Sequence, residues 1–186
     1  MPQENRDSFF TELLKFAVVA LIIVVPVRFF VAQPFIVSGA SMDPTFETGQ
    51  YLIVDELSYR FEPPNRGDVI VFKYPKDPTQ YFIKRVIGMP NETVSIKAGQ
   101  VFVEDTSGNT TKLDEKYVTN KGNGADMTVK LKNDEYFVMG DNRPESSDSR
   151  TWGTLPRENI IGRALVRLLP LQTISILPGS IVTQTK

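Results

Sequence analysis

Residues 81–87 read Tyr-Phe-Ile-Lys-Arg-Val-Ile, and this stretch decides the fold. Aromatic and β-branched residues dominate it, which predicts a β-strand rather than a helix. Alternate side chains of a strand share a face, so Lys84 and Arg85 point to opposite sides. Each face of the strand therefore carries one cation among large apolar groups.

Similar short apolar runs lie on both sides of this segment, separated by Gly- and Pro-containing breaks. They predict further strands at 35–37, 51–54, 69–72, 93–96, 100–103, 136–139 and 161–168. Short strands at close spacing indicate a mainly β fold, an antiparallel barrel-like or sandwich domain. The polar stretch at 104–132 is expected to be a small inserted hairpin or cap.

An apolar run at 13–32 precedes these strands. About 20 apolar residues are enough to cross a bilayer core of about 30 Å, so the run predicts one N-terminal transmembrane helix. The domain organisation is then a short tail at 1–12, an anchor at 13–32 and a β-rich domain at 33–186.

Two other interpretations of the apolar run are a cleaved signal peptide and a core helix. Small residues at 38–40 fit a signal-peptide cleavage site, but the residues before the run lack a positive bias. A core helix is disfavoured because the run is apolar on all sides.

The composition restricts the chemistry more than it restricts the fold. The 186 residues carry a net charge of −1 and include no histidine and no cysteine. A Ser-His-Asp triad, a thiol nucleophile and a thiolate zinc site are therefore excluded. We expect no metal and no cofactor, and the absence of a basic stripe gives no support for nucleic-acid binding.

Ser41 and Lys84 are the candidates for hydrolytic chemistry without histidine. Ser41 stands in the turn-rich segment Gly-Ala-Ser-Met-Asp-Pro-Thr at 39–45, for which a plain surface turn is the alternative. An exposed lysine has a pKa of about 10.4, but burial lowers it by roughly 3–5 pKa units and makes the amine a base. The alternative for Lys84 is an edge strand guarded by charges.

A third polar segment, Gly-Asp-Asn-Arg-Pro-Glu-Ser-Ser-Asp-Ser-Arg, occupies residues 140–150. It follows directly after an expected buried strand. By itself it fits a solvated turn closed by its own ion pairs. Its position also fits a hydrogen-bonding network that supports a nearby site.

Together these motifs resemble the type I signal peptidases, in their compact Gram-positive-like form. The resemblance is carried by the anchor and by residues 38–45, 66–72, 81–90 and 140–150, with weaker matches at 113–117, 152–153 and 160–164. It implies a membrane-bound serine endopeptidase that cleaves signal peptides from exported preproteins. Cleavage would follow small residues at Ala-X-Ala-like sites, by a Ser–Lys dyad and an acyl-enzyme intermediate.

The resemblance also implies roles for individual positions. Ser41 matches the nucleophile, Lys84 the general base and Ser146 the serine that orients the lysine. Residues matching a supporting network are Asp141, Arg143, Asp148 and Arg150. Residues matching shallow pockets for substrate side chains are Phe35, Val37, Met42, Phe82 and Ile83. Gly39 departs from members that have a serine there for the oxyanion hole, which leaves the second oxyanion donor unassigned.

The resemblance implies a single-pass protein of the cell membrane with its catalytic domain on the extracytoplasmic side. Its partners would be signal peptides of exported preproteins and membrane lipid, with no nucleic acid; the oligomeric state stays open. One alternative is a self-cleaving or conjugation-linked Ser–Lys protease, but no DNA-binding module is visible. Another is a membrane-tethered β domain that binds exported peptides without hydrolysing them.

Overall fold

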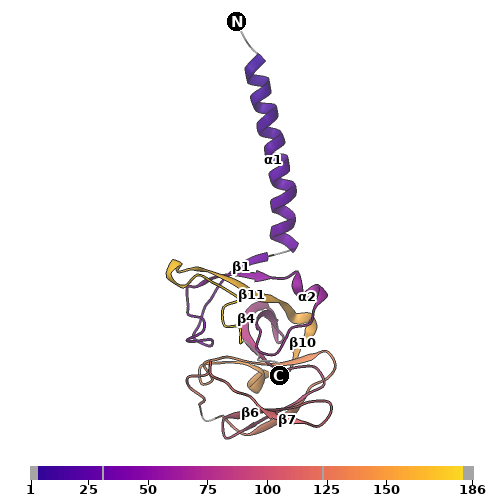
Figure 1. The fold of residues 1–186 in the computed structure, drawn as a ribbon, viewed down its shortest axis with the longest axis vertical. Coiled ribbons are helices and arrows are strands. Elements are labelled where there is room, and N and C mark those ends of the chain that lie inside the picture. The colour runs from indigo at the N-terminus through magenta and orange to yellow at the C-terminus, as the bar shows by residue number, and fades with distance from the viewer. Residues whose placement is uncertain (1–3, 31, 123, 182–186) are drawn as a thin grey trace.

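The computed structural model describes residues 4–30, 32–122 and 124–181 as one long helix followed by antiparallel sheets (Figure 1). The main sheet has the strand order β1-β2-β11-β3-β4-β9-β10, with β12 paired to β11. Its strands are β1 (Ala32–Ile36), β2 (Tyr51–Asp55), β3 (Val69–Tyr74), β4 (Asp77–Gly88), β9 (Glu135–Met139), β10 (Leu155–Pro156), β11 (Ile160–Leu169) and β12 (Ser175–Ile176). The prediction of a mainly β, antiparallel fold is confirmed.

A smaller sheet has the order β7-β6-β5-β8. Its strands are β5 (Thr93–Lys97), β6 (Gln100–Glu104), β7 (Thr110–Lys112) and β8 (Met127–Lys130). The two sheets share a buried apolar core whose members are Ile87, Val94, Ile96, Val101, Leu131, Phe137 and Met139. They pack so closely at Gly88 that a Cβ atom there would lie 2.4 Å from the Val94 side chain.

Strand β4 runs through the middle of the main sheet. It pairs with β3, where Lys84 lies opposite Ile70, and with β9, where Arg85 lies opposite Met139. The edge-strand interpretation of the two cations is therefore wrong. Residues 69–72 of β3 are all buried, as a strand covered on both faces requires.

Short helical turns complete the fold: α2 (Ser58–Phe61), α3 (Ser149–Trp152), η1 (Arg157–Asn159) and η2 (Leu171–Thr173). Trp152 of α3 packs against Phe72 and Tyr74, with ring centroids 5.9 and 5.8 Å apart. Tyr74 in turn stacks on Phe82 at 4.6 Å. This aromatic cluster covers the start of the β3–β4 hairpin and so fixes the strand that carries Lys84.

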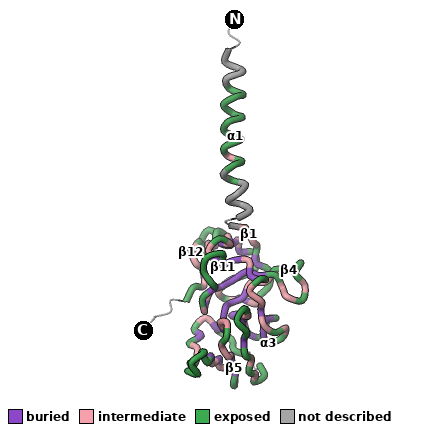
Figure 2. The backbone as a smooth tube through the Cα atoms, turned by 90° about the vertical axis from the view of Figure 1, so that its right-hand side faces the viewer, coloured by how far each residue is buried: buried purple, intermediate pink, exposed green. Residues whose placement is uncertain are grey.

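Helix α1 (Glu4–Phe30) projects away from the sheets, and β1 begins at Ala32 (Figures 1 and 2). No helix in residues 4–30, 32–122 and 124–181 combines the length and the apolar character that a bilayer crossing needs. The predicted transmembrane helix at 13–32 is thus not confirmed. Residue 31 and the side chains at 23 and 25–32 lie outside the described residues.

Candidate active site

The structure brings Ser41 and Lys84 together although 43 positions separate them in the sequence. Ser41 lies in the loop between β1 and β2, and the Lys84 Nζ is 2.8 Å from the Ser41 Oγ. The same amine donates to the Ile83 carbonyl oxygen at 2.8 Å. Lys84 is only 4% exposed. A serine hydroxyl and a buried amine are thus joined by a hydrogen bond.

The Ser41 loop is held in place from both ends. Met42 and Phe46 are buried in the core with Val37, and the Phe46 N–H donates to the Met42 carbonyl at 2.9 Å. Before Ser41, Gly39 adopts φ +96°, a backbone conformation that favours glycine. The Thr48 hydroxyl accepts from the Gly39 N–H at 3.0 Å and bonds the Gly39 carbonyl at 3.1 Å.

Burial changes the proton affinity of Lys84. Loss of water around the amine lowers its pKa from 10.5 to about 8, and the charges of Asp148 and Asp141 partly oppose this decrease. The Phe82 ring centroid lies 5.3 Å from the Nζ and helps exclude water. A large fraction of the molecules therefore carries a neutral amine, a competent base, at mildly alkaline pH.

Asp148 organises the residues behind Lys84. Its fully buried carboxylate accepts from the Ser146 hydroxyl at 2.7 Å, the Arg150 Nε at 2.8 Å and the Gly140 N–H at 3.0 Å. Among the described residues no hydrogen bond joins Ser146 to Lys84. Because Ser146 donates its only hydroxyl proton to Asp148, it is available to the amine only as an acceptor.

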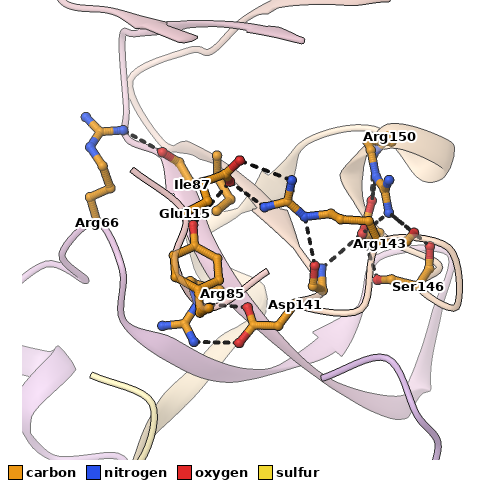
Figure 3. A network of polar contacts seen from close by, with 11 residues as sticks. Arg66, Arg85, Ile87, Glu115, Asp141, Arg143, Ser146 and Arg150 are labelled. Atoms are coloured by element: carbon orange, nitrogen blue, oxygen red, sulfur yellow. Dashed lines mark hydrogen bonds and ion pairs between the residues drawn. The ribbon is translucent and has the colours of Figure 1, made fainter. Parts of the chain in front are cut away.

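Two buried ion pairs hold Asp141 and Arg143 (Figure 3). The Asp141 carboxylate accepts from the Arg85 Nε at 2.8 Å and Nη2 at 2.6 Å, and both side chains are fully buried. It also accepts from the Thr45 hydroxyl at 2.6 Å. Arg143 pairs with Glu115. Neither Arg85 nor Glu115 was predicted to have a role. Arg85 could have been identified as the second cation among the apolar residues of 81–87.

Gly140 is a further site residue that the sequence analysis did not single out. A Cβ atom at this position would lie 2.3 Å from the Ser41 carbonyl oxygen and 2.3 Å from the Ser146 Oγ. The next turn binds the same loop, since the Asn142 N–H donates to the Ser41 carbonyl at 3.1 Å. Only glycine permits this approach of the 140–143 turn to the serine.

A cleft of about 290 Å³ opens beside the Ser41–Lys84 pair. Four of the five predicted substrate-binding residues line it: Phe35, Val37, Phe82 and Ile83. The fifth, Met42, is 1% exposed and lies in the core with Val37 instead of at the cleft surface. Glu145 and Ser147 also line the cleft, although the sequence analysis did not place them there.

The backbone N–H groups of Ser41 and Gly39 are candidate donors to an oxyanion. Within the described residues the Ser41 N–H has no hydrogen-bond partner, so it is free to donate to a substrate oxygen. The Gly39 N–H is already bound to Thr48. In the described parts of the chain no three acidic side chains gather into a possible metal site. The arrangement defines a class of site, a serine hydrolase centre that uses an amine in place of histidine.

Comparisons with known proteins agree with this class. A family model described as "Signal peptidase, peptidase S26" matches residues 10–169. "Probable signal peptidase I-1" from Synechocystis sp. is 41% identical over 91% of this chain and 87% of that protein. "Signal peptidase I" from Leptolyngbya laminosa is 39% identical over 91% and 84%. The chain belongs to the signal peptidase family, peptidase S26.

A solved structure also matches. It is a crystal structure of a signal peptidase I from Enterococcus faecalis V583, with 31% identity and a TM-score of 0.46. The match covers 55% of this chain and 97% of that chain.

Proposed function

We propose that this chain is a serine endopeptidase that cleaves signal peptides from exported preproteins after small residues. The observation that carries the proposal is the 2.8 Å contact between Ser41 and the buried amine of Lys84. Family membership supports the substrate class. Ser41 is then the nucleophile and Lys84 the general base.

In the first half of the reaction, neutral Lys84 accepts the Ser41 proton as Oγ attacks the scissile carbonyl carbon. The negative charge that develops on the carbonyl oxygen receives a hydrogen bond from the Ser41 N–H. When the tetrahedral intermediate collapses, the C–N bond breaks. The Lys84 ammonium returns its proton to the leaving amine, and the signal peptide stays bound to Ser41 as an ester.

In the second half, Lys84 accepts a proton from water as the water attacks this ester. The ester bond to Ser41 breaks, and the proton passes to Oγ. Ser146, Asp148 and Arg150 are proposed to keep the amine in place, because Asp148 binds both other side chains while its charge lies close to Lys84. Asp141 and Arg143 are proposed to support the same turn.

We propose that the cleft binds small substrate side chains, as membership of the signal peptidase family suggests. Its walls carry the large apolar side chains of Phe35, Val37, Phe82 and Ile83, within a volume of about 290 Å³. An extended peptide would bind as an added strand, with alternate side chains entering these pockets. The expected preference is therefore for alanine-like residues at the first and third positions before the cut.

The test is mass spectrometry of a model preprotein with Ala-X-Ala before the cut, incubated with the purified full chain. One cut after the second alanine is expected. Replacing that alanine with phenylalanine should lower kcat/KM by about 100-fold or more, because the proposed site accepts only alanine-like side chains at this position. A domain that only binds exported peptides would retain the intact preprotein without cutting it, and this outcome would refute the proposal.

The pH dependence of cleavage should follow the Lys84 amine. Protonated Lys84 cannot accept the Ser41 proton, so kcat/KM is expected to rise through about pH 8 and level off above it. At pH 7 about one tenth of the molecules would carry the neutral amine. Rates measured between pH 6 and 10 check this expectation. A profile that is flat through pH 8, or falls there, contradicts the assigned base.

We further propose that the enzyme is anchored in the cell membrane by a single span within 13–32, of which residues 13–30 belong to α1. A short tail at 1–12 would precede the span, and a catalytic domain at 33–186 would face the extracytoplasmic side. Described apolar side chains along α1 are exposed, including Phe16 at 74% and Leu21 at 64%. Ile36, Leu171 and Ile176 expose further apolar surface on the β domain. Such surface is suited to contact with lipid.

Deleting residues 1–32 tests this anchor. The full chain is expected to stay with liposomes after an alkaline carbonate wash, whereas the truncated chain is released. The truncated chain should still cut a soluble peptide, because the cleft residues are retained. Release of the full chain by the wash would contradict a membrane span.

A further inference from the structure

Glu115 lies in the loop between β7 and β8, far from Ser41 in sequence, yet it is bound to the turn beside the nucleophile. Its side chain is 3% exposed and the Arg143 side chain 2% exposed. The Arg143 Nη2 bonds the Glu115 Oε1, and Nη1 lies 3.3 Å from Oε2. A buried bidentate ion pair fixes the plane of the guanidinium group as well as its position.

Arg143 transmits this constraint to Gly140. Its Nε donates to the Gly140 carbonyl at 3.1 Å, while the Gly140 N–H donates to Asp148 at 3.0 Å. Both polar groups of the glycine are thus held. Since a Cβ atom at Gly140 would lie 2.3 Å from the Ser41 carbonyl oxygen, the backbone here is already in close contact with the nucleophile.

The 140–143 turn also forms hydrogen bonds with the Ser41 loop. The Asn142 N–H donates to the Ser41 carbonyl at 3.1 Å, and the Asn142 Nδ2 donates to the Ala40 carbonyl at 3.0 Å. In Figure 3 the Arg143 side chain lies between Glu115 on one side and Ser146 and Arg150 on the other. Glu115 therefore connects the small sheet to the loop that carries the reacting hydroxyl.

Tyr117 provides a second connection from the same stretch. Its hydroxyl donates to the Glu115 Oε1 at 3.2 Å, and its ring centroid lies 4.1 Å from the Arg85 guanidinium carbon. Arg85 is the partner of Asp141 in the 140–143 turn. Residues 115–117 therefore contact both arginines that hold this turn.

We propose that Glu115 is a positioning residue for the peptidase reaction, fixing the Gly140 carbonyl through Arg143 and thereby the placement of Ser41 against Lys84. It is not a catalytic residue, because Arg143 and the 140–143 turn stand between it and the serine. The inference rests on the proposed function. It assigns residues 115–117 a part in catalysis, although they follow β7 of the small sheet.

The first experiment uses Glu115→Gln in the full chain, which keeps the shape of the side chain but removes its charge. We expect kcat to fall at least tenfold, while KM stays within about threefold because the cleft walls are untouched. Asp114→Asn is the matched control. Asp114 is the neighbouring residue, and its pair with Lys116 is exposed, with side-chain exposures of 72% and 86%. The control should keep the wild-type kcat.

A second variant separates positioning from simple stability. Glu115→Gln combined with Arg143→Met leaves no unpaired buried charge, so its thermal unfolding should return close to that of the wild type. Its kcat should stay at least tenfold low, because the Gly140 carbonyl has lost the donor that Arg143 supplied. A purely structural role predicts that kcat recovers with stability, and such recovery would overturn the proposal.

Two further outcomes distinguish this inference from the proposed function. If the wild type cleaves and Glu115→Gln has a kcat within twofold of it, the inference alone is overturned. If the wild type itself leaves the model preprotein intact, the proposed function is overturned and the inference with it. Circular dichroism at the assay temperature verifies that each variant is folded.

Discussion

Lys84→Met is expected to abolish cleavage, with kcat reduced by about 10⁴-fold or more, while the fold is retained. Methionine fills a similar volume but cannot accept the Ser41 proton, and the 2.8 Å hydrogen bond between the two side chains is lost. Ser41→Ala should have an equal effect, and the double variant should be no worse than either single one. Initial rates on a model preprotein measure all three.

The same substitution should stabilise the protein at neutral pH. Because burial lowers the pKa of folded Lys84 from 10.5 to about 8, the unfolded chain binds more protons between these values. Burial of Lys84 therefore lowers the unfolding free energy of the wild type below about pH 8. This destabilisation disappears as the pH rises to 10.5. Lys84→Met removes it, raising the unfolding free energy at pH 7 by about 3 kcal/mol.

Lys73→Met is the matched control, since Lys73 lies exposed on the neighbouring strand β3. It should keep both the wild-type rate and the wild-type stability. Measurable turnover by Lys84→Met, well above that of Ser41→Ala, would exclude Lys84 as the base. A loss of stability at pH 7 would show that the amine is better hydrated than its 4% exposure indicates.

Gly140→Ala is the second substitution with a large expected effect. The added methyl group would meet the Ser41 carbonyl oxygen and the Ser146 Oγ at 2.3 Å each, and the Ser41 carbonyl, a backbone group, cannot move away without shifting Ser41 itself. We expect kcat to fall by about 10³-fold. The unfolding free energy should decrease by about 1–3 kcal/mol, as for other insertions into packed regions.

Gly124→Ala serves as the control for Gly140→Ala. A Cβ atom at Gly124 has its nearest neighbour, the Arg150 Nη1, at 3.9 Å, which is an ordinary contact. This variant should be fully active. If Gly140→Ala kept wild-type kcat, the 140–143 turn would not lie as close to the serine as described. Urea unfolding of both variants separates loss of stability from loss of rate.

Much of the fold could be predicted from local patterns. Alternation along 81–87 identified β4, and apolar runs identified the strands on either side of it in the main sheet. The absence of histidine indicated a lysine base, and the apolar neighbours of Lys84 indicated its burial. These signals are local, so they can be read from a few adjacent residues.

Other features depend on contacts between distant segments. Glu115 stands in the polar stretch that was predicted to be an inserted hairpin or cap, and only the fold shows that it is buried against Arg143, 28 positions away. Nothing near Gly140 in the sequence indicates that the Ser41 backbone lies against it. Met42 precedes Asp-Pro in a turn, yet it packs inward in the core because the loop is tethered by Phe46.

The order of these segments along the chain has a consequence for biosynthesis. The hydroxyl-bearing loop and strand β4 are translated before residue 90, whereas β9 and the turn that approaches the serine come only after residue 135. A ribosome thus releases nucleophile and base before it releases the segments that enclose them. We expect a chain that ends before β9 to leave Lys84 less buried, with its pKa nearer the ordinary value for lysine, so that peptidase activity arises only after these segments are made.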